Sequence, residues 1–415
     1  MKIKIRKEDT IALLLFLPFI EGLIDFIKIY KGNAIFRSIV FLEIIIAVLL
    51  ASKNLLSSYK GSESKKIISF HSELLFVVYT TFSLLFTNIQ YVSLSTLSWV
   101  CTPILYSMAV CIYVIKNSLS INLILRKMLI FLSWYCCFAV LRNILKNGLF
   151  INSSVRLNTT GGGPVIFGYF LAICIAILYL EKDLFSDKER IILLTIYSVT
   201  IIATGSRGAL FPALMVIISD LIMNMKTRKG FQISMFLFVS VVLILFIFDP
   251  LGKLEQLFPH FFDKEIGSRG LSYLGCLSIF GKTDMLHKII GYGWGNLFPY
   301  QEWVYKTTQI SGYSQGNIIS IMGERVLVQP HNTLLYVVLE SGIIGLVLFM
   351  GMFFKYFKES VLCKNLRYII LLIVVVFVNF FDSVFIVEPG TSSVIWLFLS
   401  FVYIKNRMVK PKEFQ

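Results

Sequence analysis

Apolar runs long enough to cross a lipid bilayer recur along the whole chain, and they restrict its fold more than any other feature. A membrane-spanning helix needs about 20 mostly apolar residues, because the hydrocarbon core of a bilayer is about 30 Å thick. The sequence therefore predicts an all-α integral membrane protein with about twelve transmembrane helices. The expected spans are 11–30, 34–52, 67–87, 95–115, 128–146, 165–180, 190–204, 208–224, 231–248, 331–354, 368–385 and 391–404.

The composition agrees with a polytopic membrane protein rather than a soluble protein with one anchor. Of the 415 residues 57% are hydrophobic, and the mean hydropathy is +0.78. The formal net charge of +15 could suggest a nucleic-acid partner. The basic residues nevertheless form short clusters between apolar runs, which is typical of cytoplasmic loops. We therefore expect membrane lipid, and no nucleic acid, as a partner.

The distribution of Lys and Arg predicts the topology. When the N-terminus is placed in the cytoplasm, every cytoplasmic loop is basic, whereas the short outer loops at 88–94 and 386–390 carry no Lys or Arg. Both termini are then cytoplasmic, and the first apolar run is a retained membrane helix rather than a cleaved signal peptide. The expected division of the chain is helices one to nine in 1–248, a long extracytoplasmic loop with short helices in 249–330, and helices ten to twelve with a basic cytoplasmic tail in 331–415.

The long loop is expected to be functional, because loops of this length without regular structure are uncommon. Within it, residues 271–280 and 285–290 have helical character, and residues 291–296 read as a cluster of turns.

The tetrapeptide Gly-Ser-Arg-Gly occurs twice, and both copies fall on the predicted outer face. One copy, residues 205–208, connects the seventh and eighth predicted helices, and the other, residues 267–270, lies in the long loop. The glycines let backbone amides approach an anion, and Ser206 and Ser268 add hydroxyl groups. The two copies therefore suggest an anion-binding site.

The arginines of the two copies, Arg207 and Arg269, are the candidate charges of that site. A guanidinium group can bind two phosphate oxygens at once, so two of them on one face suit a diphosphate. The alternatives are an arginine reaching from a helix end to the membrane surface and a solvated loop charge. Arg156, followed by the Gly-rich stretch 159–164, is a further candidate on the same face, either beside the same anion or in a flexible loop.

Residues 329–345 close the long loop and open an apolar helix. Pro330 can start this helix and Asn332 or Thr333 can cap it, so His331 lies where a membrane helix meets water. A neutral imidazole can accept a proton from a hydroxyl near pH 7 without a metal, which makes His331 the candidate general base. The alternative is an interfacial or capping histidine.

Two further residues are candidates for substrate binding, Asn332 beside that histidine and Trp294 in the long loop. The tryptophan could stack on a sugar ring, or it could belong to the aromatic belt of the membrane interface.

Carboxylates that lie well inside predicted spans include Glu21, Asp25, Glu43, Glu73, Asp220 and Glu340. They should face the protein interior, because a charge facing lipid is costly. They are either ion sites of a transporter or polar contacts between helices, with Lys28, Arg37 or Arg142 as candidate partners. The sequence contains no HExxH, CxxC, paired-aspartate, GxGxxG or Walker motif, and its seven cysteines lack metal-ligand spacing. We therefore expect no metal and no other cofactor.

The order of these motifs resembles the O-antigen polymerase and O-antigen ligase superfamily of polytopic bacterial membrane glycosyltransferases. The matching pieces are residues 204–208, then Ser268-Arg269 with residues 291–295, then residues 331–334 with 340–345. Ligase relatives often carry a Gly-x-x-Asn-Pro-Asn-like stretch where this chain has residues 161–168, and this departure favours the polymerase branch.

The resemblance implies an enzyme of the bacterial cytoplasmic (inner) membrane with its active site on the extracytoplasmic face. The donor would be an oligosaccharide on a polyprenyl diphosphate such as undecaprenyl diphosphate. Its glycan would pass to an acceptor hydroxyl with inversion and without a metal, giving a surface polysaccharide such as O-antigen or capsule. Arg207 and Arg269 would stabilise the departing diphosphate, and His331 would orient or deprotonate the acceptor hydroxyl. A membrane protein that regulates chain length is a further expected partner.

Three alternatives to a polymerase remain open from the sequence. A ligase of the same superfamily would transfer finished glycan to a lipid core, and sequence separates the two poorly. A flippase for lipid-linked oligosaccharide would use the intramembrane carboxylates, although it needs matching access from both sides of the membrane. A purely structural membrane subunit is the third alternative.

Overall fold

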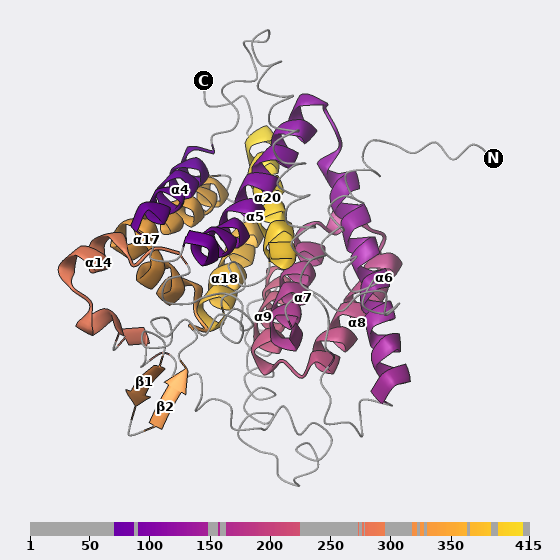
Figure 1. The fold of residues 1–415 in the computed structure, drawn as a ribbon. Coiled ribbons are helices and arrows are strands. Elements are labelled where there is room, and N and C mark those ends of the chain that lie inside the picture. Colours follow the sequence, from indigo (N-terminus) through magenta and orange to yellow (C-terminus); the bar gives the residue numbers. More distant parts are fainter. Residues whose placement is uncertain are drawn as a thin grey trace. The chain divides into compact units, whose positions relative to one another are not determined.

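The computed structural model describes residues 70–86, 90–147, 157, 163–224, 273, 276–277, 279–294, 318–321, 324–327, 330–362, 366–382 and 389–409. The chain forms two compact units that alternate along the sequence. The first unit comprises Met1–Lys31, Ser120–Lys264 and Asn365–Val378, and the second comprises Gly32–Leu119, Glu265–Lys364 and Asn379–Gln415. Figure 1 shows that the described parts of both are almost entirely helical.

The first unit is built around a helix that is buried along most of its length. Its elements are α6 (Ile121–Asn147), α7 (Gly163–Leu180), the 3₁₀ turn η5 (Lys182–Leu184), α8 (Asp187–Thr204), α9 (Arg207–Asn224) and α18 (Leu366–Phe381) as far as Val378. Helix α7 packs against both α8 and α9, and residues 166–178 of α7 are all buried. A helix that is apolar on every side belongs in the middle of a bundle, which is where α7 lies.

The second unit contains the long helix α17 (Thr333–Leu362) and the elements that pack on it. These other elements are α4 (His71–Phe82), η3 (Ser83–Phe86), α5 (Gln90–Lys116), α14 (Met285–Ile290), β1 (Ile318–Ile321), β2 (Glu324–Leu327) and α20 (Pro389–Val409). Helix α17 contacts α4, α14 and α20, while α5 packs along α20. Phe349 of α17 anchors this core through ring contacts with Phe76, Phe353 and Trp396.

Nine predicted spans coincide with helices in the part of the chain that the structure describes. The predicted spans 11–30, 34–52 and 231–248 lie outside the described residues, so the total of twelve stays a prediction. Among described helices, Ile121–Leu145 of α6 and all of α17 are long and apolar enough to cross a bilayer. Large apolar side chains such as Trp134 (70% exposed) and Val347 (64% exposed) lie on their surfaces, as expected for faces that contact lipid.

A two-stranded antiparallel sheet departs from the expected all-helical fold. Strand β1 pairs with β2, with Ile318 opposite Leu327 and Ile321 opposite Glu324. Both strands belong to the segment predicted as a long loop with short helices only. The stretch is rich in β-branched residues, which favour strands, and a purely helical expectation missed it.

Helix α17 is interrupted at Gly342, where the backbone takes the non-helical angles φ 67° and ψ −173°. The segment that follows α14 fills the interruption. The N–H groups of Tyr292 and Gly293 donate to the carbonyl oxygens of Leu339 (3.2 Å) and Glu340 (2.8 Å). A Cβ atom on Gly342 would lie 2.2 Å from the carbonyl oxygen of Ile289, so the two segments can meet only at a glycine.

A buried ion pair joins α4 to α17 in the second unit. The Glu73 carboxylate, 1% exposed, accepts hydrogen bonds from the Lys355 ammonium and, at 2.9 Å, from the Tyr356 hydroxyl. The ammonium also lies 4.7 Å from the ring centroid of Tyr403. The sequence correctly placed Glu73 in the interior. Its suggested partners were wrong for this carboxylate, because α17 continues past residue 354 and carries Lys355 into the core.

We expect Glu73→Gln to lower the free energy of unfolding by about 3 kcal/mol, because it leaves the Lys355 ammonium buried without its counter-charge. The measurement is the thermal unfolding midpoint of purified protein in detergent. The exposed pair Asp187–Arg190, whose aspartate side chain is 84% exposed, provides the control. Asp187→Asn should cost less than about 1 kcal/mol, and equal losses in the two variants would contradict a structural role for the buried pair.

Candidate functional site

The candidate site lies at the N-terminus of α17, where the chain passes from an irregular segment into the helix. The side-chain Oδ1 atom of Asn332 accepts a hydrogen bond from the N–H of Leu335 at 3.0 Å. This is an N-terminal cap, and it satisfies one of the free amides of the first turn. The sequence prediction that Asn332 can cap this helix is therefore confirmed, and His331 directly precedes the capping residue.

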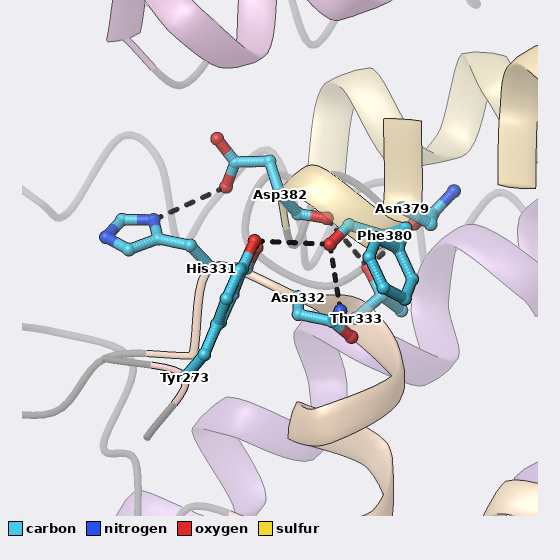
Figure 2. Close-up of polar contacts among 7 residues, drawn as sticks. All are labelled: Tyr273, His331, Asn332, Thr333, Asn379, Phe380 and Asp382. Carbon is cyan, nitrogen blue, oxygen red and sulfur yellow. Dashed lines mark hydrogen bonds and ion pairs between the residues drawn. The ribbon is translucent and has the colours of Figure 1, made fainter. Parts of the chain in front are cut away.

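The first turn of α17 is fastened to the end of α18 by side chains of the second unit (Figure 2). The Asn332 amide donates to the carbonyl oxygen of Phe380 at 2.8 Å. The Thr333 hydroxyl donates to Oδ1 of Asn379 at 2.7 Å and lies 3.2 Å from the carbonyl oxygen of Asp382. These polar contacts fix the backbone that directly follows residue 331.

Tyr273 also holds the junction between the start of α17 and the end of α18. Its hydroxyl lies 3.1 Å from the carbonyl oxygen of His331 and 3.3 Å from that of Phe380, and it can donate to either. The tyrosine comes from the segment predicted as the long loop. A residue far from His331 in sequence therefore holds the histidine backbone in place.

His331 faces the carboxylate of Asp382. The imidazole Nδ1 atom lies 3.7 Å from Oδ1 of Asp382, with the histidine side chain 40% exposed and the aspartate side chain 7% exposed. This separation is that of an ion pair and is longer than a hydrogen bond. Figure 2 shows the other ring nitrogen, Nε2, pointing away from the labelled residues. The arrangement leaves Nε2 available to a ligand.

This pair has the geometry of a general base with an orienting carboxylate. A proton on Nδ1 would face Asp382, leaving Nε2 as the acceptor, and the carboxylate would stabilise the imidazolium that forms on proton uptake. Catalytic contacts in unliganded sites are often long and tighten when substrate binds. Asp382 was not among the site residues predicted from the sequence, where it lies near the end of the predicted span 368–385. Its one local signal was a carboxylate at the end of an apolar run.

Both polar ends of the Asn332 side chain are used within the protein, by Leu335 and Phe380. The residue therefore acts in this structure as a helix cap and a link to α18. Trp294 is fully buried, and its ring stacks on Tyr336 with centroids 5.6 Å apart. Its indole is thus packed inside the second unit. The role of both residues in substrate binding stays a prediction.

The turn 205–208 lies in the first unit, between α8 and α9. Gly205 adopts the left-handed conformation that ends α8, with φ 63°, and Arg207 is the first residue of α9. A Cβ atom on Gly208 would lie 2.0 Å from the Tyr169 hydroxyl, so this glycine makes room for α7. From the sequence, these glycines were interpreted as allowing backbone amides to approach a ligand. In the structure, Gly205 also ends α8 and Gly208 also allows α7 and α9 to pack closely.

Ser206 is the residue of this turn with unused hydrogen-bonding capacity. Its side chain is buried, and its Oγ atom has no hydrogen-bond partner among the residues that the structure describes. A buried hydroxyl without a partner costs free energy unless something else binds it. The side chain of Arg207 and the residues Arg156, Ser268 and Arg269 lie outside the described part of the chain, so their roles stay predictions.

No cluster of His, Cys, Asp and Glu suited to a metal ion occurs within the described ranges. The expectation that the reaction needs no metal or cofactor stays a prediction.

Comparison with known proteins finds a family match that covers part of this site. A family model described as O-antigen ligase matches residues 192–350, a range that includes the turn 205–208 and His331. This match confirms the resemblance to the O-antigen ligase and polymerase superfamily that the order of motifs indicated. Asp382 lies beyond the matched residues. No curated protein matches the chain.

Proposed function

We propose that the chain is a polysaccharide polymerase of the O-antigen ligase and polymerase superfamily, a group of membrane enzymes that act on polysaccharide. The match of residues 192–350 to the O-antigen ligase family model supports this assignment. It joins polyprenyl-diphosphate-linked oligosaccharide repeat units into a surface polysaccharide. The observation that carries the proposal is the pairing of His331 with Asp382 at the start of α17. A half-exposed imidazole beside a buried carboxylate suits proton removal from a sugar hydroxyl.

In the proposed reaction, the acceptor hydroxyl oxygen attacks the anomeric carbon of the donor glycan. The new carbon–oxygen bond forms as the bond from that carbon to the diphosphate oxygen breaks, with inversion at the anomeric centre. The hydroxyl proton passes to Nε2 of His331, and Asp382 stabilises the resulting imidazolium. Arg207 and Arg269 stabilise the negative charge that develops on the departing polyprenyl diphosphate, where fixed positive groups are most effective.

The membrane arrangement proposed for this reaction is the one that the basic loops predict. The enzyme has about twelve spans, lies in the cytoplasmic membrane with both termini in the cytoplasm, and works at the outer leaflet. There the lipid-linked donor is anchored by its polyprenyl chain. A membrane protein that regulates chain length is a further proposed partner.

A ligase that transfers finished glycan to a lipid core is the second candidate, favoured by the description of the matching family. The same base and the same leaving group would serve both reactions, because only the acceptor differs. The stretch 161–168, which departs from the ligase pattern, is our reason for placing the polymerase first.

The test uses purified full-length protein in proteoliposomes with a lipid-linked repeat unit and without added nucleotide or metal. The products are separated on a gel. A ladder of lipid-linked oligomers supports a polymerase, whereas transfer that needs a lipid-core acceptor indicates a ligase. Folded protein that forms no product with either acceptor would contradict glycosyl transfer and redirect attention to a transport assay.

We expect Asp382→Asn to reduce kcat by between about 10- and 100-fold, a part of the full effect of a general base. The amide cannot stabilise the imidazolium by charge. KM for the lipid-linked donor should change little, because Asp382 acts through His331 rather than on the donor. Asp382→Glu, which restores the charge, should recover part of kcat. Equal losses in Asn and Glu variants, or a rise in donor KM alone, would contradict a positioning role.

A further inference from the structure

We propose that α14 and the segment 291–294 re-enter the membrane, with the apolar face of α14 lying against the acyl chains of phospholipids in the outer leaflet. The sequence placed this region in a water-exposed loop. The proposal concerns the lipid surface of the protein and goes beyond the glycosyl-transfer reaction.

The depth of the segment follows from its contact with α17. The junction lies at Gly342, nine residues after Thr333, and nine residues of helix rise about 14 Å. The polar layer of a bilayer accounts for only about 5–7 Å on each side. If α17 spans the membrane and His331 reaches water, Gly342 and the loop residues packed on it lie within the hydrocarbon layer.

The backbone at this junction has the closed hydrogen bonding that such a depth requires. Irregular backbone is tolerated in a membrane only where protein groups satisfy it. The interruption frees the carbonyl groups of Leu339 and Glu340, and the N–H groups of Tyr292 and Gly293 occupy them. The Tyr79 hydroxyl lies 3.1 Å from the carbonyl oxygen of Ile290 and 3.0 Å from that of Ser341. A loop exposed to water would not need these internal hydrogen bonds, because water would satisfy its backbone groups.

The outward face of α14 is apolar. Met285 is 70% exposed, Leu286 61% and Ile289 42%, although their side chains would be expected to avoid water. On α17, just beyond the junction, Ile343 is 46% exposed and Val347 64%. The apolar surface of α14 is thus accompanied by apolar surface on the membrane helix to which it is fastened, and this favours lipid as the occupant.

The polar groups of the segment gather toward the N-terminal end of α14. Asp284 caps the helix by accepting from the N–H of His287, which lowers the pKa of its carboxyl group. The Lys288 ammonium reaches back to the carbonyl oxygen of Gly281 at 3.4 Å and lies 5.7 Å from the ring centroid of Phe280. Such backward extension is how lysines near lipid keep their charge at the headgroups. The helix therefore enters at an angle, with Gly281 near the headgroups and Gly291 deeper.

The experiment places nitroxide spin labels on single introduced cysteines of the full-length protein in phosphatidylcholine–phosphatidylglycerol vesicles. The positions are Leu286→Cys and Ile289→Cys, with Gly281→Cys as the control because no atom lies within 4 Å of a Cβ there. Cys137→Ser removes the thiol that is exposed among the described cysteines, and this parent reports the background labelling of the remaining native cysteines. Collision with oxygen, which concentrates among acyl chains, is compared with collision with a water-soluble nickel chelate.

We expect oxygen collisions to exceed nickel collisions at residues 286 and 289 and to fall below them at residue 281. Nickel access at residues 286 and 289 equal to that at 281 would place α14 in water and overturn the proposal. Protection from both reagents would mean that protein, such as a second copy of the chain, covers the face, and would overturn it as well. The labels report position alone, so their outcome is independent of whether the protein polymerises glycans.

Discussion

Replacing His331 by alanine should lower the turnover of glycan transfer by about 10²–10⁴-fold, the usual contribution of a general base. Without the imidazole, the acceptor hydroxyl must attack while it still holds its proton. The backbone around residue 331 should survive the change, because its contacts come from Tyr273, Asn332 and Thr333 rather than from the imidazole. The measurement is single-turnover transfer from a lipid-linked repeat unit, with donor binding determined separately.

His331→Gln is the matched control, because its amide can form a hydrogen bond to the acceptor but cannot take up its proton near neutral pH. If the histidine acts as a base, the glutamine variant should be nearly as slow as the alanine variant. Recovery of most of the activity with glutamine would show that residue 331 only orients the acceptor. A loss of donor affinity equal to the loss of turnover would also argue against proton transfer.

The sequence allowed this part of the site to be predicted because the signals there are local. Pro330, Asn332 and the apolar run after them define a capped helix start, and the structure confirms it. Asp382 could not be found in this way, since its contact with His331 joins the end of one helix to the start of another. The ion pair of Glu73 with Lys355 was missed for a related reason, because a lysine just past the predicted end of a span reads as a loop charge.

The long segment before α17 was the part that sequence patterns described least well. Helix α14 was predicted with the same bounds that the structure shows, and the turns after it were recognised from their glycines. The packing of those turns against α17 was not predicted, because nothing in the sequence pattern indicates that α17 is interrupted at Gly342. Trp294 shows the consequence. It reads as an exposed loop aromatic, yet its ring is buried against Tyr336.

Replacing Arg207 or Arg269 by alanine should lower transfer by about 10²–10³-fold, the typical cost of removing one group that stabilises developing charge. Long polysaccharide should disappear while single repeat units persist. Arg207→Lys should recover only part of the activity, because an ammonium cannot bind two phosphate oxygens in parallel as a guanidinium does. Arg190, which pairs with Asp187, supplies the control, and Arg190→Ala should leave chain length unchanged.

The arginine prediction separates a diphosphate site from a surface charge. A group that stabilises the leaving diphosphate acts mainly in the transition state, so its removal should lower kcat and kcat/KM together. A solvated arginine at the membrane surface would at most weaken attraction of the anionic donor, and high salt would then abolish the difference from the unmodified protein. Normal chain length in both alanine variants, or full recovery by Arg207→Lys, would contradict the paired-guanidinium site. The reaction centre would then consist of His331 and Asp382 without a diphosphate clamp.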